Sequence, residues 1–377
     1  MNHNLFKKKY LISLFKKLIL IFGFTFLLLE VVLAIYTKNS NLNIEIPTYS
    51  LENTQSFWYD INKNFGTSHL PNNNYRQKKT CFDVTYQSNS KGFRDQERAI
   101  RSSNKRVLVL GDSFIEGVGV SREFRLSNLL EKEKNIPHLN FGMAGNFGST
   151  QYYMLYKTLA SSYTHDAILI GVLPANDFID DDYEINLKIN SDRYRPYLVG
   201  DYPHYSLTYH LDSIQKSRVH SKKLKPIKKI FKNFTYSYNV LLYAKSVLKQ
   251  SIKKDNKIVS EDEIPGYFNY SEKQLNRLKY SLEQIKSIAG EREVMVFTIP
   301  VLRDIQNYKK HKNNPLGKEM SAFCKSIGIK YLDLLLETDK ISIKDSEEQF
   351  LTCDGHWSKK GNVFAKKHIQ SFFDYYN

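Results

Sequence analysis

The sequence predicts an α/β protein in which a parallel sheet is covered by helices on both faces, in three layers. Two observations lead to this class: short continuous apolar runs, which are typical of strands buried in a parallel sheet, and helical patterns that alternate with them. The first run covers 107–110 and ends at Gly111, and the others cover 139–141, 167–172, 294–299 and 330–332. The helical patterns cover 122–134, 149–160, 272–288, 316–327 and 359–373.

One stretch, from Phe178 to about Tyr267, interrupts this alternation. It is too long for an ordinary connection between a strand and a helix. Apolar side chains recur in it at helical spacing, and lysines occupy the other helix faces. The apolar residues are Ile227, Ile230, Phe231 and Phe234, and the lysines are Lys222, Lys223, Lys228, Lys229 and Lys232. We therefore expect a helical lid or cap inserted into a domain that covers 81–377 and begins with a short strand near 81–86.

The N-terminal segment from Leu18 to Tyr36 has nineteen residues and one charge, Glu30. As a helix it would be about 28 Å long, close to the ~30 Å hydrocarbon core of a bilayer. Residues 1–17 contain five lysines and no acid, which predicts a cytoplasmic N-terminus and an extracytoplasmic domain, periplasmic or on the cell surface. Residues 37–80 are expected to be a linker and a pre-domain segment.

Two points about this segment stay open. The segment Val32-Leu33-Ala34 weakly resembles a cleavage site, so a cleaved signal peptide is the alternative to a retained anchor. Glu30 is either an intramembrane polar contact or an acid that is tolerated in lipid in its protonated form.

The net charge of +16 is concentrated in two places. Besides the five lysines of 1–17, residues 212–258 hold thirteen Lys or Arg and two acids, and the rest of the chain is balanced. A nucleic-acid-binding domain would be basic throughout its binding surface, so we expect no nucleic-acid partner. The stretch from Lys222 to Lys232 either contacts an anionic surface, such as lipid headgroups or an acidic polysaccharide, or forms a solvated helix face.

The three cysteines, Cys81, Cys324 and Cys353, are too few for a disulfide scaffold, and no C-x-x-C pair indicates zinc. The simplest expectation is three buried thiols. A disulfide between Cys324 and Cys353, next to Asp354, is the alternative. Nothing in the sequence predicts a metal or a cofactor.

The candidate catalytic residues lie where strands end and before the last helix. Ser113, in Gly111-Asp112-Ser113-Phe114, follows the first buried run, at the strand edge where open α/β folds bind ligands. Asp354 and His356 lie two residues apart before the last helical pattern, a spacing that allows a carboxylate to orient an imidazole. Gly145 follows the second run and Asn176 the third, so both are expected at the same edge as Ser113. Each is also common in an ordinary turn.

Together these segments resemble the conserved blocks of the SGNH (GDSL) hydrolase superfamily. Ser113 stands in G-D-S-F where the family commonly has G-D-S-L, Gly145 and Asn176 match the second and third blocks, and His356 matches the fifth. The segment from Asn89 to Asp95 is similar to one that precedes the first block in membrane-anchored members. The resemblance covers the chain from Arg106 onward, apart from the insertion, and implies the flavodoxin-like three-layer α/β/α fold of this superfamily.

The chain departs from the family pattern at two places. The spacing Asp354-Gly355-His356 replaces the common D-x-x-H and is similar to that of alginate O-acetyltransferase-like proteins. Pro174 replaces the glycine of the usual G-x-N-D, which puts the turn that presents Asn176 in doubt.

The resemblance implies that Ser113 is the nucleophile, that His356 is its general base and later acid, and that Asp354 orients His356. It also implies an oxyanion hole made by the backbone N–H groups of Ser113 and Gly145 and the side-chain amide of Asn176. The expected function is a membrane-anchored serine esterase, a carboxylic-ester or O-acetyl hydrolase acting outside the cytoplasm on acylated glycans or envelope components through an acyl-serine. One alternative is an O-acyltransferase that acetylates an exported polysaccharide; the other is a non-catalytic glycan-binding or scaffold protein.

Overall fold

The computed structural model describes residues 2–51, 60–188, 193–209, 226–255 and 265–373. Five parallel strands form the central sheet in the order β11–β10–β7–β5–β6. They are β5 Val107–Gly111, β6 His138–Asn140, β7 Ala167–Val172, β10 Glu293–Thr298 and β11 Lys330–Asp333. In chain order this is 2-1-3-4-5, the doubly wound order of the flavodoxin-like fold. The predicted fold class is therefore confirmed by the topology of the chain itself.

Helices cover both faces of the sheet. On one face α3 (Leu126–Lys134) packs against α15 (Lys359–Phe372), and on the other α4 (Ser149–Thr158) packs against α10 (Glu272–Ala289). The remaining short or peripheral helices of this part are α2 Ser113–Glu116, α5 Pro174–Asp180, α11 Leu302–His311, α12 Pro315–Ser326, α13 Leu334–Glu337 and α14 Ile343–Glu347. Each strand and main helix lies within a few residues of its predicted place.

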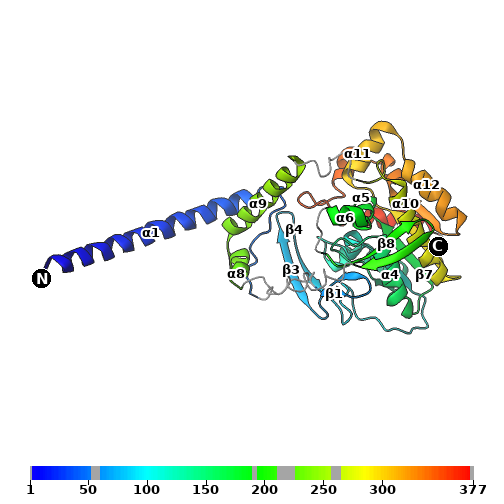
Figure 1. Cartoon of the computed structure of the whole chain (residues 1–377), viewed down its shortest axis with the longest axis horizontal. Coiled ribbons are helices and arrows are strands. Elements are labelled where there is room, and N and C mark those ends of the chain that lie inside the picture. The colour runs from blue at the N-terminus through cyan, green and yellow to red at the C-terminus, as the bar shows by residue number, and fades with distance from the viewer. Residues whose placement is uncertain (1, 52–59, 189–192, 210–225, 256–264, 374–377) are drawn as a thin grey trace.

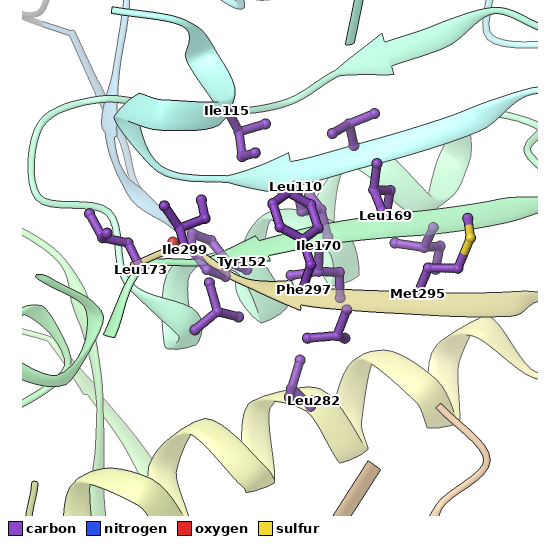
Figure 2. Packing of buried hydrophobic residues seen from close by; sticks show 14 of the residues in the cluster. Leu110, Ile115, Tyr152, Leu169, Ile170, Leu173, Leu282, Met295, Phe297 and Ile299 are labelled. Atoms are coloured by element: carbon purple, nitrogen blue, oxygen red, sulfur yellow. The ribbon is translucent and has the colours of Figure 1, made fainter. Parts of the chain in front are cut away.

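The core lies between the sheet and these helices. Every residue of β5 and β7 is buried, which explains why their sequences read as continuous apolar runs and not as alternating ones. Figure 2 shows Leu110, Ile170 and Phe297 from three neighbouring strands, with Leu282 of α10 facing them. Parallel pairing on both sides of β5 holds the carboxyl ends of β5, β6 and β7 in fixed register.

The segment before β5 contributes two hairpins. β1 (Asp60–Asn62) pairs antiparallel with β2 (Gly66–Ser68), and β3 (Asn74–Lys79) pairs antiparallel with β4 (Phe82–Gln87). The domain boundary expected at residue 81 falls in the turn of the second hairpin, so the folded domain extends further toward the N-terminus than the sequence indicated. Only β4 shows the strict buried–exposed alternation that makes a strand recognisable.

The insertion contains a β-hairpin as well as helices, so the expectation of a purely helical insertion is incomplete. Its elements are α6 Tyr183–Lys188, β8 Pro196–Asp201, β9 His204–Tyr209, α8 Pro226–Phe234 and α9 Tyr236–Asp255. The hairpin packs on the α4–α10 layer, where the rings of Tyr205 and Tyr280 meet edge to face at 5.1 Å. Lys222 and Lys223 lie outside the described residues. A lid over the site stays a prediction.

The N-terminal helix α1 runs from Asn2 to Lys38 and projects away from the domain (Figure 1). Among the described residues it is the one helix that is long and apolar enough to cross a membrane, and its apolar window is not buried. Figure 1 also shows α8 and α9 beside the end of α1 that is nearest the domain.

Candidate active site

Ser113 is the first residue of α2, directly after the carboxyl end of β5. A serine at this position often caps the following helix, but here Asp112 does so, because its Oδ1 accepts a hydrogen bond from the Phe114 N–H at 2.9 Å. The Ser113 hydroxyl is therefore not needed as a cap. Burial raises the pKa of the Asp112 carboxyl to about 7. Ser113 is 9% exposed.

The structure brings Ser113 together with both residues of the distant D-x-H segment. His356 Nε2 lies 2.8 Å from Ser113 Oγ, and its Nδ1 is hydrogen-bonded to Asp354 Oδ1. The imidazole also packs on the ring of Phe114, with 5.0 Å between ring centres. One nitrogen thus faces the hydroxyl and the other faces a carboxylate, which is the geometry by which an imidazole accepts a serine proton.

A tight turn makes the two-residue spacing of Asp354 and His356 workable. The turn closes through hydrogen bonds from Gly355 N–H to the Leu351 carbonyl (2.9 Å) and from Leu351 N–H to the His356 carbonyl (2.7 Å). Gly355 has a φ of 83°, in the left-handed region that glycine adopts without strain. The departure from the common D-x-x-H is therefore accommodated by a glycine between the two residues.

Replacing Gly355 with alanine is expected to strain this turn by about 1–2 kcal/mol and to lower kcat for a small ester by about tenfold. A Cβ at Gly355 meets no atom within 4 Å, so the effect would come from the backbone alone. Gly328 is the matched control, since it has a φ of 68° and equally open surroundings. Gly328→Ala should cost similar stability in urea unfolding and leave kcat unchanged. Equal kcat values for the two variants would contradict a positioning role for the turn.

The turn of the β3–β4 hairpin holds the loop that carries Asp354 and His356. Lys79 Nζ binds Asp354 Oδ2, the carboxylate oxygen that His356 does not use. Burial alone would raise the pKa of Asp354, but the hydrogen bond with His356 and the charges of His356 and Lys79 outweigh it and hold this pKa well below its usual value. Asp354 is consequently ionised at neutral pH.

A disulfide joins the same two segments. Cys81, two residues after Lys79, is bonded to Cys353, with 5.7 Å between their Cα atoms. Both cysteine expectations are therefore wrong: the three thiols are not all free, and the partner of Cys353 is not Cys324. Cys324 is buried and unbonded, and burial raises its pKa to about 12.

Replacing Lys79 with methionine is expected to lower the free energy of unfolding at pH 7 by about 1.5–3 kcal/mol, since a charge-assisted hydrogen bond is lost. Because the pKa of Asp354 is depressed in the folded chain, this contribution is fully present above the unfolded pKa of about 3.9 and is lost only as pH falls below that value and through the lower folded pKa. The difference between wild type and variant in urea unfolding should therefore be constant from pH 7 to about pH 4 and shrink as pH falls further. Lys78→Met, which removes a neighbouring charge paired with Asp83, is the control. A difference of the same size for both variants would contradict the assignment.

The segment from Asn89 to Asp95 holds the turn that follows Ser113. Arg94 is 1% exposed, and its guanidinium donates to the carbonyls of Glu116 (3.1 Å), Val120 (2.6 Å) and Gly117. These carbonyls lie at or after the end of α2, where they have no partner within the helix. Sequence reasoning noted this segment by resemblance only, and its contacts show that it braces α2.

Gly145 and Asn176 lie in the connections that follow β6 and β7, the two strands that flank β5. Gly145 has a φ of 105°, and a Cβ there would come within 2.8 Å of Thr67 Cγ2. Its carbonyl accepts hydrogen bonds from Thr67 Oγ1 (3.1 Å) and Arg193 (2.7 Å). These two hydrogen bonds to the carbonyl therefore fix the orientation of the Gly145 peptide group.

Asn176 is exposed in the first turn of α5, which begins at Pro174. Proline is favoured at the first position of a helix, where its missing N–H costs nothing. The replacement of the usual glycine by Pro174 is thus compatible with a normal helix start. The roles of Gly145 and Asn176 as oxyanion donors stay predictions.

The chain matches no protein-family model and no curated protein. Solved structures similar to it include a member of the lipolytic protein G-D-S-L family from Veillonella parvula, with 11% identity over 71% of this chain and 98% of that chain and a TM-score of 0.38. The lipase/acylhydrolase from Enterococcus faecalis has 12% identity over 71% and 96%, with a TM-score of 0.36. A GDSL-like lipase from Bacteroides thetaiotaomicron has 10% identity over 73% and 90%, with a TM-score of 0.37. Two of these three neighbours are thus named as G-D-S-L or GDSL-like lipolytic proteins and the third as a lipase/acylhydrolase.

Proposed function

We propose that this protein is a membrane-anchored serine esterase that acts outside the cytoplasm on acylated glycans or envelope components. The observation that carries the proposal is the continuous contact from Ser113 Oγ through the His356 ring to Asp354. A serine hydroxyl is a weak nucleophile until a base accepts its proton, and this arrangement supplies the base in the correct orientation.

In the proposed reaction His356 Nε2 takes the proton of Ser113 as Oγ bonds to the ester carbonyl carbon. The negative charge on the carbonyl oxygen is stabilised by the N–H groups of Ser113 and Gly145 and by the Asn176 amide. The C–O bond to the alcohol then breaks, and His356 returns the proton to the leaving oxygen. In the second half His356 takes a proton from water, the hydroxyl oxygen attacks the acyl carbon, and Ser113 leaves with the proton. Asp354 stays ionised and stabilises the imidazolium throughout.

Three features support the extracytoplasmic placement. α1 is long and apolar enough to span a bilayer, five lysines lie in residues 1–17 and favour a cytoplasmic N-terminus, and the Cys81–Cys353 disulfide is a bond that persists in oxidising compartments. The disulfide is independent of the other two features, because it does not depend on the apolar segment or on the lysines before it.

The experiment is to treat the full-length protein in detergent with a serine-directed fluorophosphonate and to weigh it. One adduct, mapped to Ser113 and absent from Ser113→Ala and from unfolded protein, is the expected result. A folded wild-type protein that takes up no adduct would instead favour a non-catalytic glycan-binding or scaffold role.

O-acyl transfer to an exported polysaccharide is the second candidate, favoured by the Asp354-Gly355-His356 spacing. It differs only in the group that attacks the acyl-serine, an acceptor hydroxyl in place of water. Incubation with an acetyl donor, with and without isolated envelope polysaccharide, separates the two. Acetate release that is unaffected by the polymer indicates an esterase, and acetyl transfer to the polymer at the expense of acetate indicates a transferase.

A further inference from the structure

The helix α8 turns its apolar face outward. Ile227, Ile230, Phe231 and Phe234 recur at the spacing of one helix face, and they are 64%, 47%, 48% and 38% exposed. In a soluble helix such a face is normally buried against the core. A contiguous exposed apolar face marks an interaction surface.

The following helix, α9, continues this pattern. Leu241, Ala244 and Leu248 lie at helical spacing and are exposed, Leu241 and Leu248 at 63% each. Lysines accompany the apolar residues on both helices: Lys228, Lys229, Lys232, Lys245 and Lys249. Apolar residues on one face with lysines around them are typical of helices that lie in the headgroup region of a membrane.

The helix α9 is attached to α1, and α8 packs against α9. The carboxylate of Glu30 in α1 accepts hydrogen bonds from the backbone N–H groups of Tyr236 (2.6 Å) and Ser237 (3.0 Å), at the start of α9. This is the polar contact that the sequence analysis left open for Glu30. It provides the acid with donors within an otherwise apolar segment, as an acid near lipid requires.

The linker after α1 strengthens the attachment and connects it to the site. Lys232 of α8 pairs with Glu45 at 2.6 Å, and the Tyr49 N–H donates to the Asn233 carbonyl at 3.0 Å. Glu45 in turn forms an antiparallel bridge with Lys79, the residue that binds Asp354. α8 therefore lies on the side of the domain that carries the candidate active site.

The depth of Glu30 matches the depth expected for a surface helix. Glu30 lies six residues before Tyr36, the end of the apolar segment, which is about 9 Å along a helix. Amphipathic helices lie about 5–10 Å deep at the boundary of headgroups and acyl chains. A membrane crossed by α1 would thus reach the start of α9, which binds Glu30 and directly follows α8, at the level where such helices bind.

We propose that α8 and the first turns of α9 lie in the interfacial region of the membrane that α1 crosses, with Ile227, Ile230, Phe231 and Phe234 toward the acyl chains. The proposal rests on the proposed anchoring by α1. The domain would then lie against the membrane surface with its active-site side toward the lipid. It would not move independently of the membrane on a flexible linker. Continuity with α1 favours lipid over a second copy of the chain or an acidic polymer.

The test uses the full-length protein in liposomes of phosphatidylcholine and phosphatidylglycerol, with Cys324 replaced by serine. Single cysteines at Phe22, Ile230 and Ile100 carry an environment-sensitive fluorophore, and quenching by nitroxide-labelled lipids is measured. Ile230 and Ile100 are both 47% exposed. Ile100 is the matched control, because its carbonyl binds Thr164 beside the amino ends of the strands, opposite Ser113.

We expect quenching at Phe22 and Ile230 that is several-fold stronger than at Ile100. Quenching at Phe22 with equal, weak quenching at Ile230 and Ile100 would overturn the surface contact and leave the anchor intact. No quenching at Phe22 would reject the anchor itself, and ester turnover in the same liposomes reports on the enzyme separately.

Self-quenching at Ile230 that depends on protein density, without lipid quenching, would assign the face to a second copy and so overturn the proposal. Phe231→Cys, at 48% exposed, is the second reporter if Ile230→Cys does not fold.

Discussion

Replacing Ser113 with alanine is expected to lower kcat for a small acetyl ester by on the order of 10⁶, because the hydroxyl that His356 contacts is lost and the remaining groups act only on water. The change removes one oxygen from a helix start that Asp112 already caps, so the fold should be retained. Steady-state turnover and urea unfolding of the full-length variant measure the two effects.

The control for this result is the combination with His356→Ala. Ser113 and His356 act as one unit through their 2.8 Å contact, and residues that act as a unit lose activity without additivity. The double variant should therefore be no slower than Ser113→Ala alone. Undiminished turnover in Ser113→Ala would reject the assignment of the nucleophile, and additive losses would show that His356 acts independently of Ser113.

Replacing Asp354 with asparagine is expected to lower kcat by about 10⁴, since the amide favours the wrong imidazole tautomer and no longer stabilises the imidazolium. In this chain the substitution has a second consequence. Lys79, whose side chain is 12% exposed, would lose the anion that it binds. Asp354→Asn should therefore also lower the free energy of unfolding. Turnover and urea unfolding, measured on the same samples, report the two losses.

The double variant Lys79→Met, Asp354→Asn separates stability from catalysis. It removes the unpaired cation together with the carboxylate, and replacing both members of a buried pair costs much less than removing one. Stability should recover relative to Asp354→Asn, while kcat stays low. Recovery of kcat along with stability would show that Asp354 acts only by holding the loop and not on His356.

Sequence patterns predicted the sheet well because the signal is local. A strand that is buried on both faces must be apolar at every position, so the runs at 107–110 and 167–172 identify β5 and β7 without any knowledge of their neighbours. The hairpins β3–β4 and β8–β9 were less visible, because β3 alternates weakly and is partly exposed throughout.

The site was predictable only in part. Ser113 follows a buried run and so could be placed at a strand end, but its pairing with His356 came from a resemblance and not from any local pattern. The contacts that hold the site were not predictable: Lys79 binds Asp354 from 275 residues away, and Cys81 reaches Cys353 across 272 residues. Glu30 meets Tyr236 across 206 residues.

The sequence alone determined the layered α/β fold, the apolar N-terminal helix and the strand end that carries Ser113, since each depends on which side chains a short segment must bury. The tertiary structure decided which cysteines are bonded, which lysine neutralises Asp354 and what Glu30 binds. The partner of a single charge or thiol depends on which distant segments pack against it. The sequence alone is compatible with many such partners, and the tertiary packing decides which of them lies within bonding distance.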